Sequence, residues 1–375
     1  MSPLYQTYLS LVRAALWNEQ VTWPDEYTED LLRLNAMQGT GALVYPFVLE
    51  QPTLSSYARA HMKSVCVSAM QKIIPLQHTL ELAWTALEKA GIRPVLMKGA
   101  GLAALYPEPH FRTFGDIDLF VGIDQYHPAC AVMRETFPNA LKFDEELDHY
   151  KHYNLIADGI SIEVHRVSVG LQHPIDERRY ARMEQYGMTH AIPITNDQSA
   201  ISNQQLAITF LIPEPTFNAL FVFLHSWEHM MTQGANVRQL CDLALLLHRY
   251  AEQIDAARLK HYLTSLHLLD VWQLYMYHLV CWLGLPRTEA LFYTERVANR
   301  AERLMNDLLA GKMVEQTPTE KAPTNRIARK WHTMRSRFAN ARRIKTYSPA
   351  YARHMNSTTL LNGARRFFAK DRHWE

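Results

Sequence analysis

The chain has 375 residues, of which 48% are hydrophobic, so it can form one large domain or two to three smaller ones around a sizeable core. Its first 20 residues predict an amphipathic helix rather than a signal peptide. The most apolar stretch, 266–285, contains histidines and an aspartate, which favours a buried helix over a membrane span. Four scattered cysteines without a C-x-x-C pair argue against disulfides and a cysteine zinc site, and they predict a cytoplasmic protein.

The net charge of +2 conceals an uneven distribution. From Lys321 to the C-terminus lie 14 of the 39 Lys/Arg residues but only two of the 37 Asp/Glu residues, so this tail is near +12 and the rest of the chain near −10. The tail also mixes arginines with aromatic residues, a composition that suits nucleic acid. We therefore expect the tail either to fold back on the acidic body or to meet an external anion.

Taken in chain order, residues 1–90 predict an N-terminal helical region, because apolar residues recur at spacings of three and four up to a helix stop at Gly91. Residues 91–200 predict a mixed core. Its expected elements are a strand at 92–99, a short helix at 101–106, a strand at 116–122, a helix at 125–137, and a β-hairpin at 149–168 around the turn dipeptide Asp158-Gly159.

The remainder of the chain predicts a second helical domain and a basic extension. Residues 201–314 form the expected helical domain, with helix beginning near Asn203 and continuing to about Leu309. Residues 315–375 form the expected basic linker and tail, in which 315–325 have the composition of a linker and the rest is partly helical.

Two aspartates interrupt the apolar strand at 116–122. Residues i and i+2 of a strand point to the same face, so Asp116 and Asp118 project together while Ile117 and Leu119 face the other side. Adjacent carboxylates repel each other unless a cation lies between them, and burial increases that cost. The pattern favours a hard divalent cation with oxygen ligands, such as Mg²⁺, although a D-x-D pair at a wet strand end needs no ligand.

The hairpin supplies a third carboxylate. In "GISIEVHR" the alternation places Glu163 and His165 on one face and the isoleucines on the other. If this strand lies beside Asp116 and Asp118, the three acids could hold two metal ions about 3.5–4 Å apart, as in-line phosphoryl or nucleotidyl transfer requires.

A glycine-containing turn precedes the two aspartates. Gly99, Ala100 and Gly101 stand where a strand changes into a helix, so the backbone could approach a ligand closely and offer free N–H groups to phosphate. Lys98 and Arg112 supply nearby cations. The alternative is a tight turn that binds nothing.

These residues resemble the DNA polymerase β-like nucleotidyltransferase superfamily, and within it the bacterial family of uncharacterised nucleotidyltransferases. The similarity lies in "LMKGAGLAALYPEP", "FRTFGDIDLFV" and "IEVHR", and more weakly in "NVRQLCDLALLL". It covers about residues 90–250 and is most specific over 96–121. The resemblance implies an α+β nucleotidyltransferase fold, a small mixed sheet with flanking helices, with helical N-terminal and C-terminal regions and 91–200 as the catalytic core.

The resemblance also implies roles for individual residues. Asp116 and Asp118 would be metal ligands, Glu163 the third catalytic and metal-binding acid, and Gly99 with its neighbours the segment nearest the triphosphate. The superfamily's usual Gly-Gly or Gly-Ser pair is Gly99-Ala100 here, so a serine hydroxyl is absent while the backbone N–H groups remain.

Further polar residues are candidates for substrate contact. "HSWEH" matches the H-x-x-E-H zinc-protease pattern, but the pattern favours a helix with buried apolar residues whose His225 and His229 lie at a cleft or core edge, where either could touch a substrate. Arg238 and Asp242 share a helix face and could form a surface pair or contact the triphosphate. His165 and Asp242 are candidate general bases.

The sequence thus predicts an enzyme of the nucleotidyltransferase class that uses Mg²⁺, with Mn²⁺ as the alternative, to transfer a nucleoside monophosphate. The donor would be a nucleoside triphosphate, with ATP first among candidates, and the acceptor a hydroxyl of a small molecule or protein. Two alternatives stay open: a catalytically silent nucleotidyltransferase fold that binds a nucleotide or a partner, and an RNA-binding protein that uses the basic tail.

Overall fold

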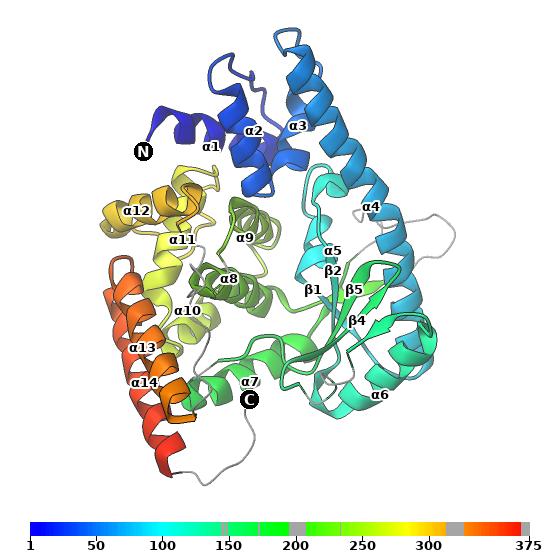
Figure 1. The fold of residues 1–375 in the computed structure, drawn as a ribbon, viewed down its shortest axis with the longest axis vertical. Coiled ribbons are helices and arrows are strands. Elements are labelled where there is room, and N and C mark those ends of the chain that lie inside the picture. The colour runs from blue at the N-terminus through cyan, green and yellow to red at the C-terminus, as the bar shows by residue number, and fades with distance from the viewer. Residues whose placement is uncertain are drawn as a thin grey trace.

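The N-terminal part of the protein is helical, as expected. The computed structural model describes residues 1–143, 147, 149–171, 173–194, 208–232, 234–312 and 326–368. Its first helices are α1 (Pro3–Trp17), α2 (Thr28–Met37), α3 (Gly41–Val48) and the 34-residue α4 (Ser56–Lys89). The Ser55 hydroxyl caps α4 by accepting a hydrogen bond from a backbone N–H of its first turn. α1 to α3 lie at one end of the molecule, and α4 extends from them along the sheet (Figure 1).

A mixed five-stranded sheet follows. Its strands are β1 (Val95–Met97), β2 (Asp116–Phe120), β3 (Leu141–Lys142), β4 (His152–Ala157) and β5 (Ile160–His165). They lie in the order β1-β2-β5-β4-β3, with β2 and β5 parallel and every other neighbouring pair antiparallel. The sheet, the predicted hairpin and the many helices confirm the expected α+β class with a small mixed sheet.

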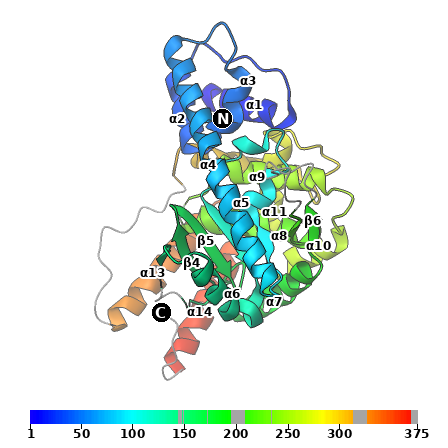
Figure 2. The same cartoon turned by 90° about the vertical axis from the view of Figure 1, so that its right-hand side faces the viewer.

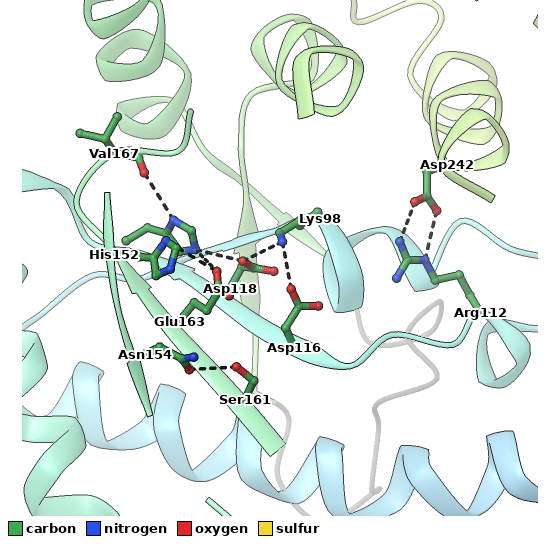
Figure 3. A network of polar contacts seen from close by, with 11 residues as sticks. Lys98, Arg112, Asp116, Asp118, His152, Asn154, Ser161, Glu163, Val167 and Asp242 are labelled. Atoms are coloured by element: carbon green, nitrogen blue, oxygen red, sulfur yellow. Dashed lines mark hydrogen bonds and ion pairs between the residues drawn. The ribbon is translucent and has the colours of Figure 1, made fainter. Parts of the chain in front are cut away.

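Helices cover both sides of this sheet. α5 (Lys98–Ala103) and the 3₁₀ turn Pro109–Phe111 lie in the β1–β2 connection, and α6 (Gly122–Thr136) follows β2. α4 and α6 lie on one side, and α8 (Pro215–Thr232) and α9 (Val237–Arg249) lie on the other (Figures 1 and 2). The carboxylates of Asp116, Asp118 and Glu163 lie on the side of β2 and β5 away from the blue helix α4 (Figure 3).

One sequence expectation is wrong at the start of the second helical region. Residues 208–214 are not helical but contain β7 (Phe210–Ile212), which pairs with β6 (Ile192–Ile194). Pro213 and Pro215 explain this, because a proline disfavours helix in the residue before it and is well placed in the first turn of a helix, here α8. The expected start near Asn203 and the expected linker at 315–325 lie outside the described residues. α7 (Pro174–Thr189), which the sequence pattern did not single out, separates the two sheets.

The C-terminal half is helical beyond α9. Its further helices are α10 (Ala256–Ser265), α11 (Leu269–Cys281), α12 (Ala298–Leu309), α13 (Arg326–Lys345) and α14 (Pro349–Phe368), with a 3₁₀ turn at Glu295–Val297. The predicted buried helix in 266–285 is α11. In the described part of the chain, no helix combines the length and apolar character needed to cross a bilayer.

The described part of the basic tail packs on the body. α13 and α14 form a hairpin beside α10 and α11 (Figure 1). Ile344 is fully buried, the Tyr347 hydroxyl donates to the Asp307 carboxylate, and the Ser348 hydroxyl donates to Asp270. Apolar burial and hydrogen bonds therefore hold the tail against the body in addition to the attraction between opposite charges.

Candidate active site

Three carboxylates converge on one face of the sheet. β2 and β5 run parallel with Asp118 beside Glu163 in register, and Asp116 lies two residues before Asp118 on the same face. Ligand oxygens of all three lie within 4.8 Å of one another. Ile117 and Leu119 are fully buried on the opposite face, which fixes the strand's orientation. We call Asp116, Asp118 and Glu163 the carboxylate cluster (Figure 3).

Lys98 reaches the carboxylate cluster from the turn between β1 and α5. Its Nζ lies 3.0 Å from Asp116 Oδ2 and 3.1 Å from Asp118 Oδ1. Burial alone would lower the pKa of Lys98, but the three carboxylates outweigh it and raise the pKa above its ordinary value. The backbone of Lys98 has a φ of 33°, which is rare for a non-glycine residue and costs about 1–3 kcal/mol, so the surrounding structure holds this turn in place.

His165 joins the other side of the cluster. Its Nε2 lies 2.9 Å from Asp118 Oδ1 and 3.1 Å from Glu163 Oε2. Burial would lower the pKa of His165, yet these two hydrogen bonds raise it overall. The pKa of Glu163 falls to about 2: burial pushes it up, but the hydrogen bond and charge of His165, and then Lys98, push it further down. His165 therefore orients both acids.

Only one of the two carboxylate oxygens of Asp118 has a hydrogen-bond partner. Its side chain is fully buried, and its Oδ2 makes no hydrogen bond. A buried carboxylate oxygen without a partner is costly unless a cation or a donor reaches it. A hard cation with oxygen ligands fits this donor set, because two aspartates and a glutamate converge around the unpaired oxygen.

Two histidines of α8 face the cluster from the opposite side. The pKa of His225 lies well below its ordinary value because of burial first and the charge of Lys98 second. The pKa of His229 is lowered by the same two causes, while Asp116 and Glu163 act in the other direction. The rings are 4.4 Å apart. Within the described residues, three groups of histidines and acids could hold a metal ion, and none includes either α8 histidine, so the zinc-protease pattern gains no support.

His152 is a site residue that the motif reasoning missed. Its Nδ1 lies 3.9 Å from Glu163 Oε2, and its ring centroid lies 5.0 Å from that of His165. β4 pairs with β5 so that His152 is opposite His165. Burial lowers the pKa of His152 to about 4, so its imidazole is neutral near pH 7. His152, Glu163 and His165 form a second donor group that shares Glu163 with the carboxylate cluster.

Arg112 and Asp242 pair with each other. Arg112 Nε donates to Asp242 Oδ1 at 3.1 Å and its Nη2 donates to Oδ2 at 2.6 Å, and the Tyr106 hydroxyl donates to Oδ1 at 2.7 Å. Arg112 and Asp242 are 5% and 4% exposed, so this pair is closed to solvent (Figure 3). Arg238 donates to the Thr113 carbonyl and to its hydroxyl, and its buried Nε has no hydrogen-bond partner. These contacts fasten α9 to the loop that leads into β2.

The glycine turn is shaped by close packing. Gly99 has a φ of 21°, and a β-carbon there would lie 3.4 Å from the Asp116 carbonyl oxygen. A β-carbon at Gly101 would lie 3.2 Å from the Leu96 carbonyl oxygen. Ala100 is buried between them. The turn therefore brings its backbone directly against the start of β2.

Comparison with known proteins places this geometry in a family. No curated protein and no solved structure is similar enough to the chain to count as a match. A family model does match: that of the uncharacterised nucleotidyltransferases, over residues 24–284. This match spans most of the chain and includes the sheet, Lys98, the carboxylate cluster and the two histidines of α8. The chain therefore belongs to the uncharacterised nucleotidyltransferase family.

Proposed function

We propose that the protein transfers a nucleoside monophosphate from a nucleoside triphosphate to a hydroxyl of a small molecule or protein in the cytoplasm, with ATP as the first donor to test. The observation that carries the proposal is the carboxylate cluster, in which the buried Asp118 has one oxygen without a partner. Membership of the nucleotidyltransferase family supports the reaction class. The four free cysteines are compatible with a reducing compartment.

Asp116, Asp118 and Glu163 would hold Mg²⁺, or Mn²⁺ in its place. When bound, these cations supply charge neutralisation at the triphosphate and lower the pKa of the acceptor hydroxyl. His165 keeps Asp118 and Glu163 oriented through its two hydrogen bonds. In other metal sites, groups that hydrogen-bond to the metal ligands without touching the metal fix the orientation of those ligands, and His165 would act in the same way.

Lys98 is the residue best placed to bind the triphosphate. Its ammonium now bridges Asp116 and Asp118, and cations bound there would release it to contact a phosphate oxygen. The backbone of Gly99, Ala100 and Gly101 would approach the same phosphates. The Arg112–Asp242 pair and the contacts of Arg238 with Thr113 act by positioning the loop before β2.

His225 and His229 would line the acceptor side of the site. Both are held neutral by burial and by Lys98, so they can donate or accept a hydrogen bond to an uncharged acceptor group. Neither candidate general base is free to serve the acceptor hydroxyl, because both oxygens of Asp242 accept hydrogen bonds and His165 Nε2 is held by Asp118 and Glu163.

The test is label transfer from α-labelled ATP in Mg²⁺, with a mixture of metabolites, with cell protein and with RNA as separate acceptor pools. We expect label in one pool and none with γ-labelled ATP, since the bond broken lies between the α- and β-phosphates. The outcome that contradicts the proposal is Mg²⁺-dependent ATP binding with no label in any pool and no pyrophosphate released, which is the behaviour of a silent fold.

A further inference from the structure

A second cluster of metal-binding side chains lies away from the carboxylate cluster. His173 and Asp176 stand at the start of α7, and His354 stands on α14. The donor atoms of these three side chains lie within 4.8 Å of one another. His354 Nε2 is 2.6 Å and His173 Nδ1 is 3.6 Å from the same oxygen, Asp176 Oδ2.

The carboxylate is oriented for this role. Arg179, one helical turn further along α7, donates to Asp176 Oδ1 at 3.4 Å, which leaves Oδ2 directed at the two histidines. Burial would raise the pKa of Asp176, but the His354 hydrogen bond and charge lower it overall, so the carboxylate is ionised near pH 7. Outer-shell donors of this kind fix metal-ligating carboxylates.

His173 is the least satisfied member. Its Nδ1 is buried and makes no hydrogen bond, and its side chain does not cap α7 although it occupies the N-cap position. A structural salt bridge would need only His354 and Asp176. A buried imidazole nitrogen that faces a carboxylate from beyond hydrogen-bonding distance is better explained by something that binds between them.

We propose that His173, Asp176 and His354 form a binding site for a zinc-type divalent transition metal. Two imidazoles and one carboxylate are the donor set typical of zinc sites with three protein ligands. With ligand bonds of about 2.0–2.2 Å, tetrahedral donor atoms lie about 3.4 Å apart. The 3.6 Å separation already fits, and the 2.6 Å contact needs to lengthen by less than 1 Å as the metal replaces a proton.

The fourth position opens into a cavity. Two of the three ligands, His173 and His354, border a cavity of about 860 Å³ that is also lined by His267, Arg179 and Arg353. The His267 ring stacks on that of His354 at 4.3 Å, and its backbone φ of 60° is a left-handed value rare for a residue other than glycine. A water or a small anion held by the two arginines would complete the coordination, with His267 beside it.

The site joins segments that are far apart in the chain. His354 and Asp176 are separated by 178 residues, so a bound metal would tie α14 of the basic tail to α7, the helix after β5. Metal binding would therefore stabilise the docked tail by the linkage between binding and folding.

The experiment uses the full chain with Asp118→Asn and Glu163→Gln, so that neither the carboxylate cluster nor the His152–Glu163–His165 group, which shares Glu163, competes for metal. After chelation and dialysis, Zn²⁺ is titrated calorimetrically and Co²⁺ is followed by its visible absorption. We expect one equivalent of Zn²⁺, a tetrahedral Co²⁺ spectrum and a higher melting temperature. His173→Gln in this background should weaken Zn²⁺ binding at least tenfold.

His173→Gln is informative because no hydrogen bond of Nδ1 is lost. After the metal is removed by chelation, this variant should therefore have the same melting temperature as its parent. Asp176→Asn is the second ligand variant. The matched control is His190→Gln at the other end of α7, where Nδ1 bonds to the Tyr186 carbonyl of its own helix, and it should bind Zn²⁺ like the parent. The proposal is overturned if no Zn²⁺ equivalent is found, or if both ligand variants bind it as tightly as the control.

Discussion

Two groups of buried charges lie on either side of the same loop, and they are completed in different ways. In the Arg112–Asp242 pair, both carboxylate oxygens accept hydrogen bonds and nothing is left over. In the carboxylate cluster, Lys98 and His165 face three acids, and Asp118 Oδ2 has no partner. A complete pair holds two elements together. An incomplete cluster around the buried Asp118 is suited to binding a cation, because the cation supplies the missing partner.

The strongest way to test this contrast is Asp118→Asn. The substitution keeps the size of the side chain and removes its charge, so a metal ion held by the carboxylate cluster would lose a ligand, and the proposed site would lose several kcal/mol of transition-state stabilisation. We expect transfer to fall on the order of 10³-fold or more. The metal-free variant should be as stable as the parent or more so, because the remaining acids repel less. Thermal unfolding with and without Mg²⁺–ATP, and label transfer, measure both quantities.

The result that contradicts the metal assignment is the reverse pattern. An Asp118→Asn protein that melts much earlier without ligand, yet keeps the full Mg²⁺–ATP shift, would show that Asp118 is a structural partner of Lys98 and His165 rather than a metal ligand.

Asp242→Asn should behave in the opposite way. It leaves the Arg112 guanidinium buried without a counter-charge, which costs about 3–5 kcal/mol of unfolding free energy. Metal affinity should stay nearly unchanged in the fraction that remains folded. Denaturant unfolding measures the loss. Asp30→Asn is the matched control, because the Arg33–Asp30 pair is exposed and its loss should cost less than about 1 kcal/mol. Equal losses in the two variants would show that the closed pair has no special role.

The carboxylate cluster could be predicted from sequence because it depends on local rules. Strand alternation places Asp116 and Asp118 on one face, and it places Glu163 on the polar face of the hairpin. The same hairpin could have identified His152. In a hairpin that turns at Asp158-Gly159, paired residues are equally distant from the turn, so residue 152 must oppose residue 165.

The Arg112–Asp242 pair and the cluster of His173, Asp176 and His354 could not be predicted in this way. Arg112 and Asp242 are 130 residues apart, and they meet only because α9 packs against the loop before β2. From the sequence alone, Arg112 is a candidate for nucleotide binding, because a sequence does not show which cations are already paired with an acid. The error at 208–214 has a local cause, because the two prolines favour an extended segment before α8.

Glu184 is another buried acid, and its hydrogen bonds come from the uncharged residue Ser168. Glu184 Oε1 accepts hydrogen bonds from Ser168 N at 2.6 Å and Ser168 Oγ at 2.5 Å, but burial dominates and raises its pKa from 4.5 to about 7. The folded protein therefore holds a proton that the unfolded chain releases above pH 4.5. Its contribution to stability is complete below pH 4.5 and is lost as the pH rises to 7, about 3 kcal/mol in all.

Glu184→Gln removes this titration. The difference in unfolding free energy between the parent and Glu184→Gln should fall by about 3 kcal/mol between pH 4.5 and 7 and stay constant above it. Chemical denaturation across that range measures the difference. A difference that does not vary with pH would mean that Glu184 is ionised in the folded protein.

Lys98→Met tests the cation that neutralises the carboxylate cluster when no metal is bound. It removes the ammonium that bridges Asp116 and Asp118, so repulsion in the metal-free cluster increases and stability should fall by about 2 kcal/mol. Mg²⁺ should restore more stability to this variant than to the parent, while transfer falls because a phosphate contact is lost. The melting temperature over a Mg²⁺ titration measures the first effect. An equal Mg²⁺ shift in both proteins would show that Lys98 and the metal do not share a position.

The smallest effect should come from salt acting on the basic tail. α13 and α14 are held by buried residues such as Ile344 and Tyr347 and by the hydrogen bond from the Arg343 guanidinium to the Met231 carbonyl, in addition to their charge. Raising the salt from about 0.1 M to about 1 M shortens the screening length from about 10 Å to about 3 Å, so it removes the long-range attraction between the tail and the acidic body and leaves the apolar contacts.

Docking should weaken by less than about 1 kcal/mol. In chelator-containing buffer, native-state proteolysis within 326–368 should accelerate less than about fivefold. An acceleration far above this would mean that charge dominates the docking, and none at all would mean that the tail is held without any help from its charge.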